Sequence, residues 1–455
     1  MITQTFKNFF SEGHERTLAV KKNAVVTFFL KGASILFGLI MVPMTIDYVN
    51  PLQYGIWLTL SSVIVWFSIL DIGLGNGLKN KLAEAVARND IKLAKEYIST
   101  GYGMLAVISL ALIGLYAMLK PFLSWSAILH APLSLNLELN VLAFYLVLLF
   151  GLQFILHLVN VIFHALQQTA KAAMVTFVGS IFSLIMLLIL KATTHGSLLY
   201  LGVSLFSGSL LSMVIYSVHF FYFDRRELKP SFRFFKLKHV KGLLNVGIKF
   251  FVIQLAFIVQ FQSTNFIISR YFSPLEVTQY NIPLRLFSAC QLVFNVALTP
   301  LWTSVTEAYT QKDFNWIIAT ERKLLVLWRY MFVFSVFVLL FSDIIYGIWL
   351  NHKVNVPFAN SLGIMLYIMT MTYGSIYVVI LNGIGAIHQQ FKLGIISMVL
   401  FFPLTYLIAI IFKLGVPGIS ISLIISNFNG LIFAPLQYKR LIGRWIKANH
   451  RPNQI

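Results

Sequence analysis

The stretch Ala172–Leu190, with the sequence AAMVTFVGSIFSLIMLLIL, contains no charged residue. As a helix rising 1.5 Å per residue, it is about 28 Å long, which matches the roughly 30 Å hydrocarbon core of a bilayer. Its apolar residues are continuous and do not alternate with polar ones, which argues against a strand of an outer-membrane barrel. The stretch therefore predicts a transmembrane helix.

Similar stretches recur along the chain and account for most of its length. Twelve apolar segments are long enough to cross a membrane. They cover residues 24–48, 53–78, 97–119, 139–163, 172–190, 198–222, 245–270, 279–302, 324–349, 359–384, 393–412 and 415–436. We therefore expect an all-α polytopic membrane protein with twelve transmembrane helices.

The composition excludes several other classes of protein. Of 455 residues, 58% are hydrophobic and 11% are charged, whereas soluble chains carry about 25% charged residues. A soluble multidomain enzyme is excluded on this ground, and the 41 Phe and 19 Tyr residues exclude a disordered chain. The predicted loops are too short for a separate catalytic domain, so neither an enzyme nor a cofactor is expected.

The net charge of +20 comes from 35 Lys and Arg residues against 15 Asp and Glu residues. If the N-terminus is cytoplasmic, 26 of the 35 cations fall in cytoplasmic tails and loops, five in outer loops and four in spans. This bias is the positive-inside pattern of a multi-pass inner-membrane protein whose termini are both cytoplasmic. The basic charge is thereby explained without a nucleic-acid partner.

The chain also repeats itself in two halves. Short matches at equivalent span boundaries are offset by 222 or 223 positions. They pair Asn50-Pro51 with Ser273-Pro274, Glu84-Ala85 with Glu307-Ala308, Asp90 with Asp313, and Asn160 with Asn382. Because each half has an even number of spans, both insert in the same orientation. The repeat predicts two six-helix bundles related by a pseudo-twofold axis along the membrane normal.

This division gives four regions. We expect an N-terminal bundle at 1–222, a basic cytoplasmic linker at 223–244, a C-terminal bundle at 245–436 and a basic cytoplasmic tail at 437–455. The linker carries seven cations. It is interpreted either as a lever or lipid-surface contact, or as a connection whose charge only sets topology.

Ionisable groups inside spans are costly and usually face a partner or a wet cavity. Lys31 in the first span and Asp71 in the second lie at similar depths. Lys31 is predicted to bind an anionic group of a substrate, with Asp71 tuning or releasing it. Alternatively, the two residues form an ion pair, or Lys31 extends to the inner surface.

Arg285 follows Pro283 in the eighth span and has no charged counterpart in the first half. Its guanidinium offers a bidentate fork for phosphate. The alternative is an ion pair with Glu276 or Asp47 at the outer face.

The seventh span carries further candidates. Gln254, Gln262 and Asn265 are spaced to share one helical face, which suits sugar hydroxyls or interhelical hydrogen bonds. Lys249 and Arg270 near its ends are predicted to contact substrate, unless they only extend to the membrane surfaces.

Other features are ordinary packing in most proteins. His157 is either a proton-handling group or a packed histidine. The run from Asp71 to Gly77, DIGLGNG, lacks the Lys-Ser/Thr of a phosphate-binding loop, and predicts a bend or close packing. The histidines show no metal-binding spacing.

Two segments carry a family resemblance. The sequences NPLQYGIW at 50–57 and LDIGLGNG at 70–77 look like the signature of bacterial polysaccharide (O-antigen) flippases of the multidrug/oligosaccharidyl-lipid/polysaccharide exporter superfamily. The loop EAVARND at 84–90, and LTPLW at 298–302 with Glu307-Ala308, fit the same pattern.

The resemblance implies a V-shaped arrangement of two bundles around a central cationic cavity. It also implies alternating-access transport of an undecaprenyl-pyrophosphate-linked oligosaccharide to the periplasmic leaflet. Lys31 and Arg285 would match cations near the family's cavity. Expected partners are the lipid-linked oligosaccharide, membrane lipid, a coupling proton or sodium ion, and polysaccharide polymerase and ligase machinery.

Two other functions remain open. A cation-coupled multidrug antiporter of the same superfamily would need mid-span carboxylates, whereas the four span cations favour an anionic substrate. A non-transporting scaffold for glycan assembly would carry intramembrane charges without function.

Overall fold

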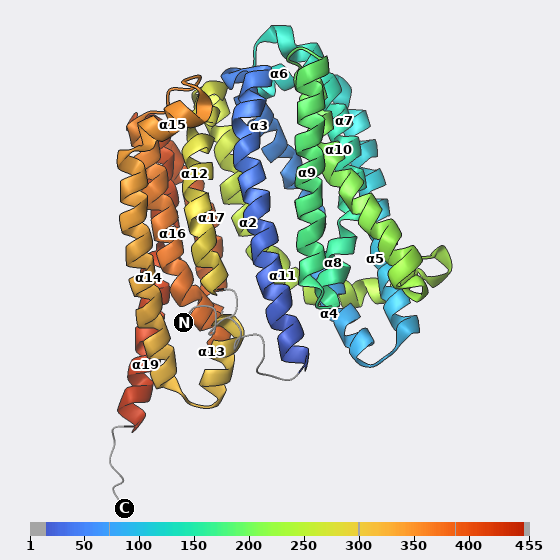
Figure 1. Cartoon of the computed structure of the whole chain (residues 1–455), viewed down its shortest axis with the longest axis vertical. Coiled ribbons are helices and arrows are strands. Elements are labelled where there is room, and N and C mark those ends of the chain that lie inside the picture. Colours follow the sequence, from blue (N-terminus) through green and yellow to red (C-terminus); the bar gives the residue numbers. More distant parts are fainter. Residues whose placement is uncertain (1–14, 72, 299–300, 387, 450–455) are drawn as a thin grey trace, which may run out of the picture. The chain divides into compact units, whose positions relative to one another are not determined.

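The computed structural model describes residues 15–71, 73–298, 301–386 and 388–449, and it forms two compact units, 1–255 and 256–455. The boundary between the units lies inside one long helix, α11 (Leu237–Tyr271). Within the described ranges every regular element is helical. The helices follow the colour gradient in Figure 1.

Unit 1 contains the helices up to the first half of α11. Its α-helices are α2 (Glu15–Val49), α3 (Pro51–Trp66), α4 (Leu74–Ala87), α5 (Ile91–Leu119), α6 (Trp125–Leu129), α7 (Asn136–Leu156), α8 (Leu158–Ala165), α9 (Thr169–Thr193) and α10 (Leu198–His219). Shorter turns join them, namely η1 (Phe67–Asp71), η2 (Lys120–Phe122), η3 (Leu133–Leu135), the π-helical η4 (Phe220–Asp224), η5 (Arg226–Leu228) and η6 (Phe232–Phe234).

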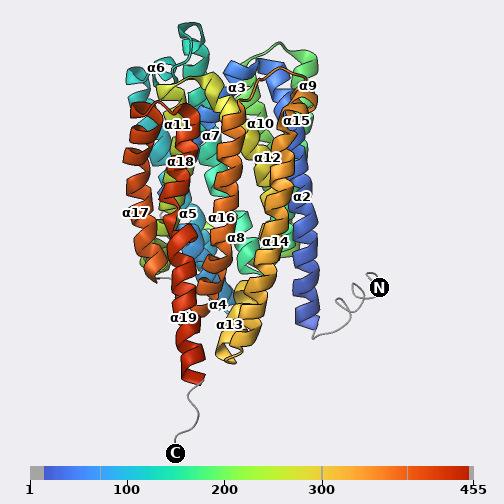
Figure 2. The ribbon, with the colours of Figure 1, turned by 90° about the vertical axis from the view of Figure 1, so that its left-hand side faces the viewer.

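Unit 2 contains the remaining helices. They are α12 (Pro274–Leu298), α13 (Leu301–Thr310), α14 (Phe314–Leu340), α15 (Ser342–Leu350), α16 (Phe358–Ile384), α17 (His388–Thr405), the π-helical η7 (Tyr406–Ile411), α18 (Gly415–Ser426), the π-helical η8 (Asn429–Phe433) and α19 (Ala434–Asn449). Helix α16 is central in this unit, since it packs against α12, α13, α14, α18 and α19 (Figure 2).

The prediction of a polytopic all-α membrane protein is confirmed. In the described part of the chain, nine helices are long and apolar enough to cross a membrane. A tenth span results if α18 and the segment 429–443, bent by 44° from each other, are one broken span. Twelve spans and the pseudo-twofold axis stay predictions.

The second predicted span is not one continuous helix. It is divided into α3, η1 and α4, and Gly73 occupies the left-handed region at the start of α4, with φ of 77°. Gly77 lies so close to α11 that an added Cβ would be 2.0 Å from the carbonyl oxygen of Leu243. The glycine run therefore provides both the bend and the close packing that its sequence predicts.

The internal repeat is visible in local geometry at two boundaries. Asp90 accepts the N–H of Leu93 (2.9 Å) at the start of α5, and Asp313 accepts the N–H of Trp316 (3.0 Å) at the start of α14. The residue before each cap, Asn89 or Lys312, is left-handed. These capped turns stand 223 positions apart, as the sequence matches predict.

The first boundary repeats in the same way. Asn50 accepts the N–H of Gln53 before α3, and Ser273 accepts the N–H of Glu276 before α12. A third boundary differs, because the turns that end α8 and α16 lie 218 positions apart, at Gln167 and Gly385. At this boundary the sequence match has an offset of 222 positions, which differs from the structural offset of 218 by about one helical turn.

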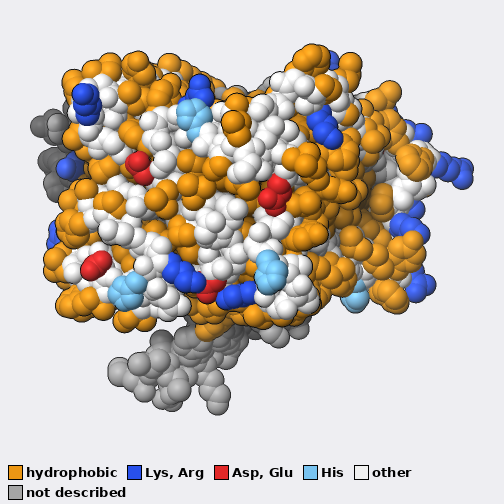
Figure 3. All heavy atoms as spheres, turned by 90° about the horizontal axis from the view of Figure 1, so that it is seen from above, with side chains coloured by type: hydrophobic (Ala, Val, Ile, Leu, Met, Phe, Trp, Pro, Cys, Tyr) orange, Lys and Arg blue, Asp and Glu red, His pale blue; other side chains and the backbone are white. Residues whose placement is uncertain are grey.

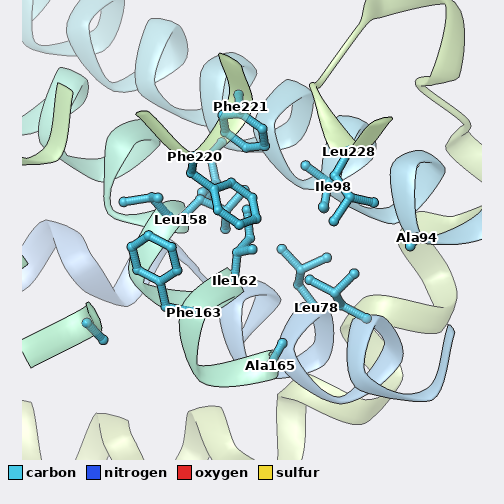
Figure 4. Packing of buried hydrophobic residues seen from close by; sticks show 14 of the residues in the cluster. Leu78, Ala94, Ile98, Leu158, Ile162, Phe163, Ala165, Phe220, Phe221 and Leu228 are labelled. Carbon is cyan, nitrogen blue, oxygen red and sulfur yellow. The ribbon is translucent and has the colours of Figure 1, made fainter. Parts of the chain in front are cut away.

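A hydrophobic cluster holds the lower part of unit 1 together. Leu78 of α4, Ile98 of α5, and Ile162 and Phe163 of α8 pack around Phe220 of η4 (Figure 4). Leu228, in the segment that follows α10, is also part of this cluster and is 2% exposed. The cluster therefore fixes α8 and the beginning of the linker relative to α4 and α5.

Candidate functional site

A group of cationic and titratable side chains lies in unit 1. His164 is within electrostatic range of Lys79, Lys31 and His157. All four side chains are exposed. They come from three different elements, α2, α4 and the α7–α8 segment, and we call them the cationic cluster.

The local sequence explains how α8 presents its two histidines. His157 is the residue at which α7 ends and α8 begins, and its N–H still donates to the carbonyl of Gln153 (2.8 Å). His164 lies seven residues further, or two helical turns, so both histidines are on one face of α8. The opposite face carries Ile162 and Phe163 into the core.

Lys31 is placed by the packing of α2 against α9. One turn earlier on α2, the hydroxyl groups of Thr27 and Thr169 are 3.4 Å apart. Lys31 has no ion pair with Asp71 among the described residues. An exposed ammonium group without a bound carboxylate is suited to bind an anion.

Asp71 instead caps a helix. Its two carboxylate oxygens lie 3.0 and 3.2 Å from the N–H of Gly75, in the first turn of α4. A negative charge at a helix N-terminus is favourable for the helix dipole. Asp71 thus helps to fix α4, which carries Lys79 of the cationic cluster.

In unit 2, Arg285 lies on α12, two residues after Pro283, and is half-buried. Among the described residues of unit 2 it makes no ion pair, and its predicted pairing with Glu276 is not formed. Asp47 pairs with Lys191 at 3.1 Å. Within the described part of unit 2, the guanidinium on α12 therefore has no carboxylate partner.

The polar side chains of the seventh predicted span differ in their burial and contacts. Asn265 is buried and accepts a hydrogen bond of 2.8 Å from the amide of Asn281, which joins α11 to α12. Gln262 is half-buried and Arg270 is exposed at the end of α11. The side chains of Lys249 and Gln254 lie outside the described residues.

A separate surface hollow of about 440 Å³ runs along α13. It is lined by Trp302, Thr306, Glu307, Thr310 and Gln311. Its lining has a carboxylate and no cation, so it does not suit an anionic ligand. Figure 3 shows Lys or Arg side chains beside an acidic and a His side chain near its lower edge, and other charged side chains singly among hydrophobic and uncharged ones.

Sequence reasoning missed two members of the cationic cluster, Lys79 and His164. Lys79 was assigned to topology because it lies just past a predicted span. The separation of seven between His157 and His164 was the available signal, since it places both on one helical face.

Comparisons of this chain with known proteins are consistent with this architecture. A family model described as "Polysaccharide biosynthesis protein" matches residues 20–303, well over half of the chain. The chain belongs to the polysaccharide biosynthesis protein family. The predicted resemblance to polysaccharide flippases is confirmed at this level.

Two curated relatives of this chain are both called "Putative O-antigen transporter". The one from Salmonella typhimurium is 22% identical over 317 residues, which cover 67% of this chain and 70% of the relative. The one from Salmonella typhi is 22% identical over 273 residues, which cover 59% of this chain and 61% of the relative.

Solved structures share the fold of this polysaccharide biosynthesis protein. An inward-facing multidrug resistance transporter of the MATE family, in the MOP superfamily, aligns with a TM-score of 0.71 at 15% identity, covering 92% of this chain and 96% of the other. A MOP superfamily transporter from Pyrococcus furiosus aligns with a TM-score of 0.63 at 16% identity, covering 94% and 96%. At these identities the likeness concerns the fold alone.

Proposed function

We propose that this protein moves an undecaprenyl-pyrophosphate-linked oligosaccharide, an O-antigen or similar repeat unit, from the cytoplasmic to the periplasmic leaflet of a bacterial inner membrane. The observation that carries the proposal is family membership over residues 20–303, together with relatives named as O-antigen transporters. The chemistry of the two units adds support, because each has exposed or half-buried cations that suit a pyrophosphate.

The barrier to such transport is the solvation of the head group. A pyrophosphate with attached sugars is strongly hydrated, whereas the lipid tail can stay in the bilayer during the crossing. Lys31, Lys79 and His164 of unit 1 and Arg285 of unit 2 would replace water around the pyrophosphate with charge-assisted hydrogen bonds. Gln262 would contribute contacts to sugar hydroxyl groups.

Movement of the head group needs two states of the protein with different affinities for it. A proton or sodium gradient can bias these states if a titratable group binds the ion in one of them. Asp71 and His157 are our candidates, because Asp71 caps α4, which carries Lys79, and His157 belongs to the cationic cluster. Polymerase and ligase machinery would use the product in the periplasmic leaflet.

The proposal is tested with purified protein in proteoliposomes that contain a fluorescent, undecaprenyl-pyrophosphate-linked oligosaccharide in one leaflet. We expect the protein to move the labelled head group to the other leaflet, as measured by its accessibility to a membrane-impermeant quencher. A cationic dye loaded in parallel liposomes should not be moved. Dye transport without head-group transport would instead establish a multidrug antiporter, and the absence of both would favour a scaffold.

A further inference from the structure

The segment between α10 and α11 is attached to α5 by specific contacts. The N–H of Ser231 donates to the hydroxyl of Ser99 (3.1 Å), and the N–H of Lys236 donates to the hydroxyl of Thr100 (3.1 Å). The ring of Phe235 lies against Gly103, where an added Cβ would be 2.6 Å from it. The segment therefore has a defined conformation on the side of unit 1.

The end of this segment is fixed by a nearly buried pair. The imidazole Nε2 of His239 lies 2.7 Å from a carboxylate oxygen of Glu96, and the two side chains are 13% and 10% exposed. The ring of Tyr97 packs edge-on against His239, with the centroids 4.8 Å apart. Together with buried Leu228, these contacts hold both ends of the segment against α5.

The opposite side of the same segment faces outward with an unusual composition. Phe232 is 98% exposed, Leu237 is 71% exposed and Phe223 is 70% exposed. Exposed cations alternate with them, namely Arg226, Lys229, Arg233, Lys236 and Lys238. Large apolar groups interleaved with Lys and Arg are typical of elements that lie at a membrane interface.

The position of the segment along α5 matches an interfacial depth. The large apolar side chains exposed along α5 are Ile91 at its first residue and then a run from Val107 through Leu110 and Leu115, which is its expected lipid-facing belt. Gly103, which contacts Phe235, is four residues or about 6 Å before Val107 along the helix axis. In Figure 1 the yellow-green turns after α10 lie beside α5. The segment thus borders the lipid-facing belt of α5 on its predicted cytoplasmic side.

We propose that residues 222–238 form an interfacial element that inserts Phe232, Phe223 and Leu237 among the lipids of the cytoplasmic leaflet. The neighbouring cations bind the phosphates of anionic phospholipids. Each Lys or Arg near an anionic surface contributes about 1 kcal/mol of attraction. The nearest carboxylates are already engaged, since Asp224 pairs with Lys171 at 2.5 Å and Glu227 pairs with Arg225 at 3.4 Å.

The single cysteine of the chain makes the proposal directly testable. In a Cys290→Ser background, Phe232→Cys is labelled with a nitroxide, and the full-length protein is placed in nanodiscs. The substituted side chain is almost fully exposed, so folding is not at risk. We expect the label to be several-fold more accessible to oxygen, relative to a water-soluble nickel chelate, than a label at a matched aqueous position. Lys92→Cys, exposed near the start of α5, provides that position.

The lipid composition and the cations supply the second part of the test. With phosphatidylglycerol in the nanodisc, label 232 should be deeper than in phosphatidylcholine alone. The triple variant Arg233→Gln, Lys236→Gln and Lys238→Gln should lose this difference. Equal nickel accessibility at 232 and 92 in both lipids overturns the proposal. If the label at 232 inserts to the same depth with and without phosphatidylglycerol, and in the triple variant, the proposed role of the cations is wrong.

Discussion

Two polar regions of the molecule, one in each unit, differ in their residue types and in what their side chains contact. In unit 1, Lys31, Lys79 and His157 are exposed side chains that lie within electrostatic range of the exposed His164. In unit 2, Asn265 is buried and hydrogen-bonded to Asn281 across the α11–α12 contact. We propose that the first region binds an anion, whereas the hydrogen bond of the second joins two helices. Arg285, four residues after Asn281 on α12, has no carboxylate partner among the described residues of unit 2.

Removing charge from the cationic cluster should have the largest effect on transport. Lys31→Ala would remove the proposed charge-assisted contact to the pyrophosphate, a type of hydrogen bond that contributes about 1.5–3 kcal/mol. We expect the rate in the proteoliposome assay to fall by at least about tenfold, since 1.4 kcal/mol corresponds to a factor of ten.

The matched control is Lys191→Ala, which removes an exposed cation that already pairs with Asp47. Its transport rate should stay close to that of the unchanged protein. Equal losses in the two variants would mean that net charge matters and the position of Lys31 does not.

Arg285 tests whether unit 2 contributes a cation of its own. Arg285→Ala should reduce transport nearly as much as Lys31→Ala. Arg285→Lys should restore only part of it, because an ammonium group lacks the bidentate geometry of a guanidinium. Full activity of the lysine variant in the same assay would reduce the role of Arg285 to simple charge.

A substitution of Asp71 distinguishes a role in helix capping from a role in ion coupling. Asp71→Asn keeps an oxygen that can accept the Gly75 N–H, so the melting temperature should change little. If Asp71 binds the coupling ion, transport driven by an ion gradient should fall to the rate seen without a gradient. Unchanged gradient-driven transport would leave Asp71 as a helix cap alone.

The smallest effect on transport is expected for the Asn265–Asn281 contact. Asn281→Leu leaves a buried acceptor without this donor, which costs about 1–3 kcal/mol of stability. The thermal unfolding temperature in detergent should fall, while transport per folded molecule stays the same. A loss of transport at full stability would move Asn281 and Asn265 into the substrate path.

The sequence predicts the helices better than their interruptions. Continuous apolar stretches identify membrane helices because their length must match the bilayer, and α16 begins and ends within one residue of its predicted span. The exact position of the break depends on the left-handed Gly73, and the close packing at Gly77 depends on Leu243, which lies far away in the chain. Such long-range contacts leave no periodic signal in the sequence.

Contacts between residues far apart in the sequence also explain why part of the candidate site was predicted and part was missed. Lys31 and Arg285 were identified because a charge within an apolar stretch needs an explanation. Lys79 and His164 lie at span ends, where cations are expected from topology, and only the packing of α4 and α8 brings them near Lys31. The linker's attachment to α5 was equally hidden, since Ser99 and Ser231 are separated by most of unit 1.

The most direct test of the central claim is the affinity of the cationic cluster for the charged head group. Binding of a water-soluble, short-chain analogue of the pyrophosphate-linked sugar is measured by calorimetry with the purified protein and with Lys31→Ala. The account predicts a Kd at least about tenfold weaker for the variant, and an affinity of the unchanged protein that falls as salt increases. Equal Kd values for the two proteins, with no dependence on salt, would contradict it.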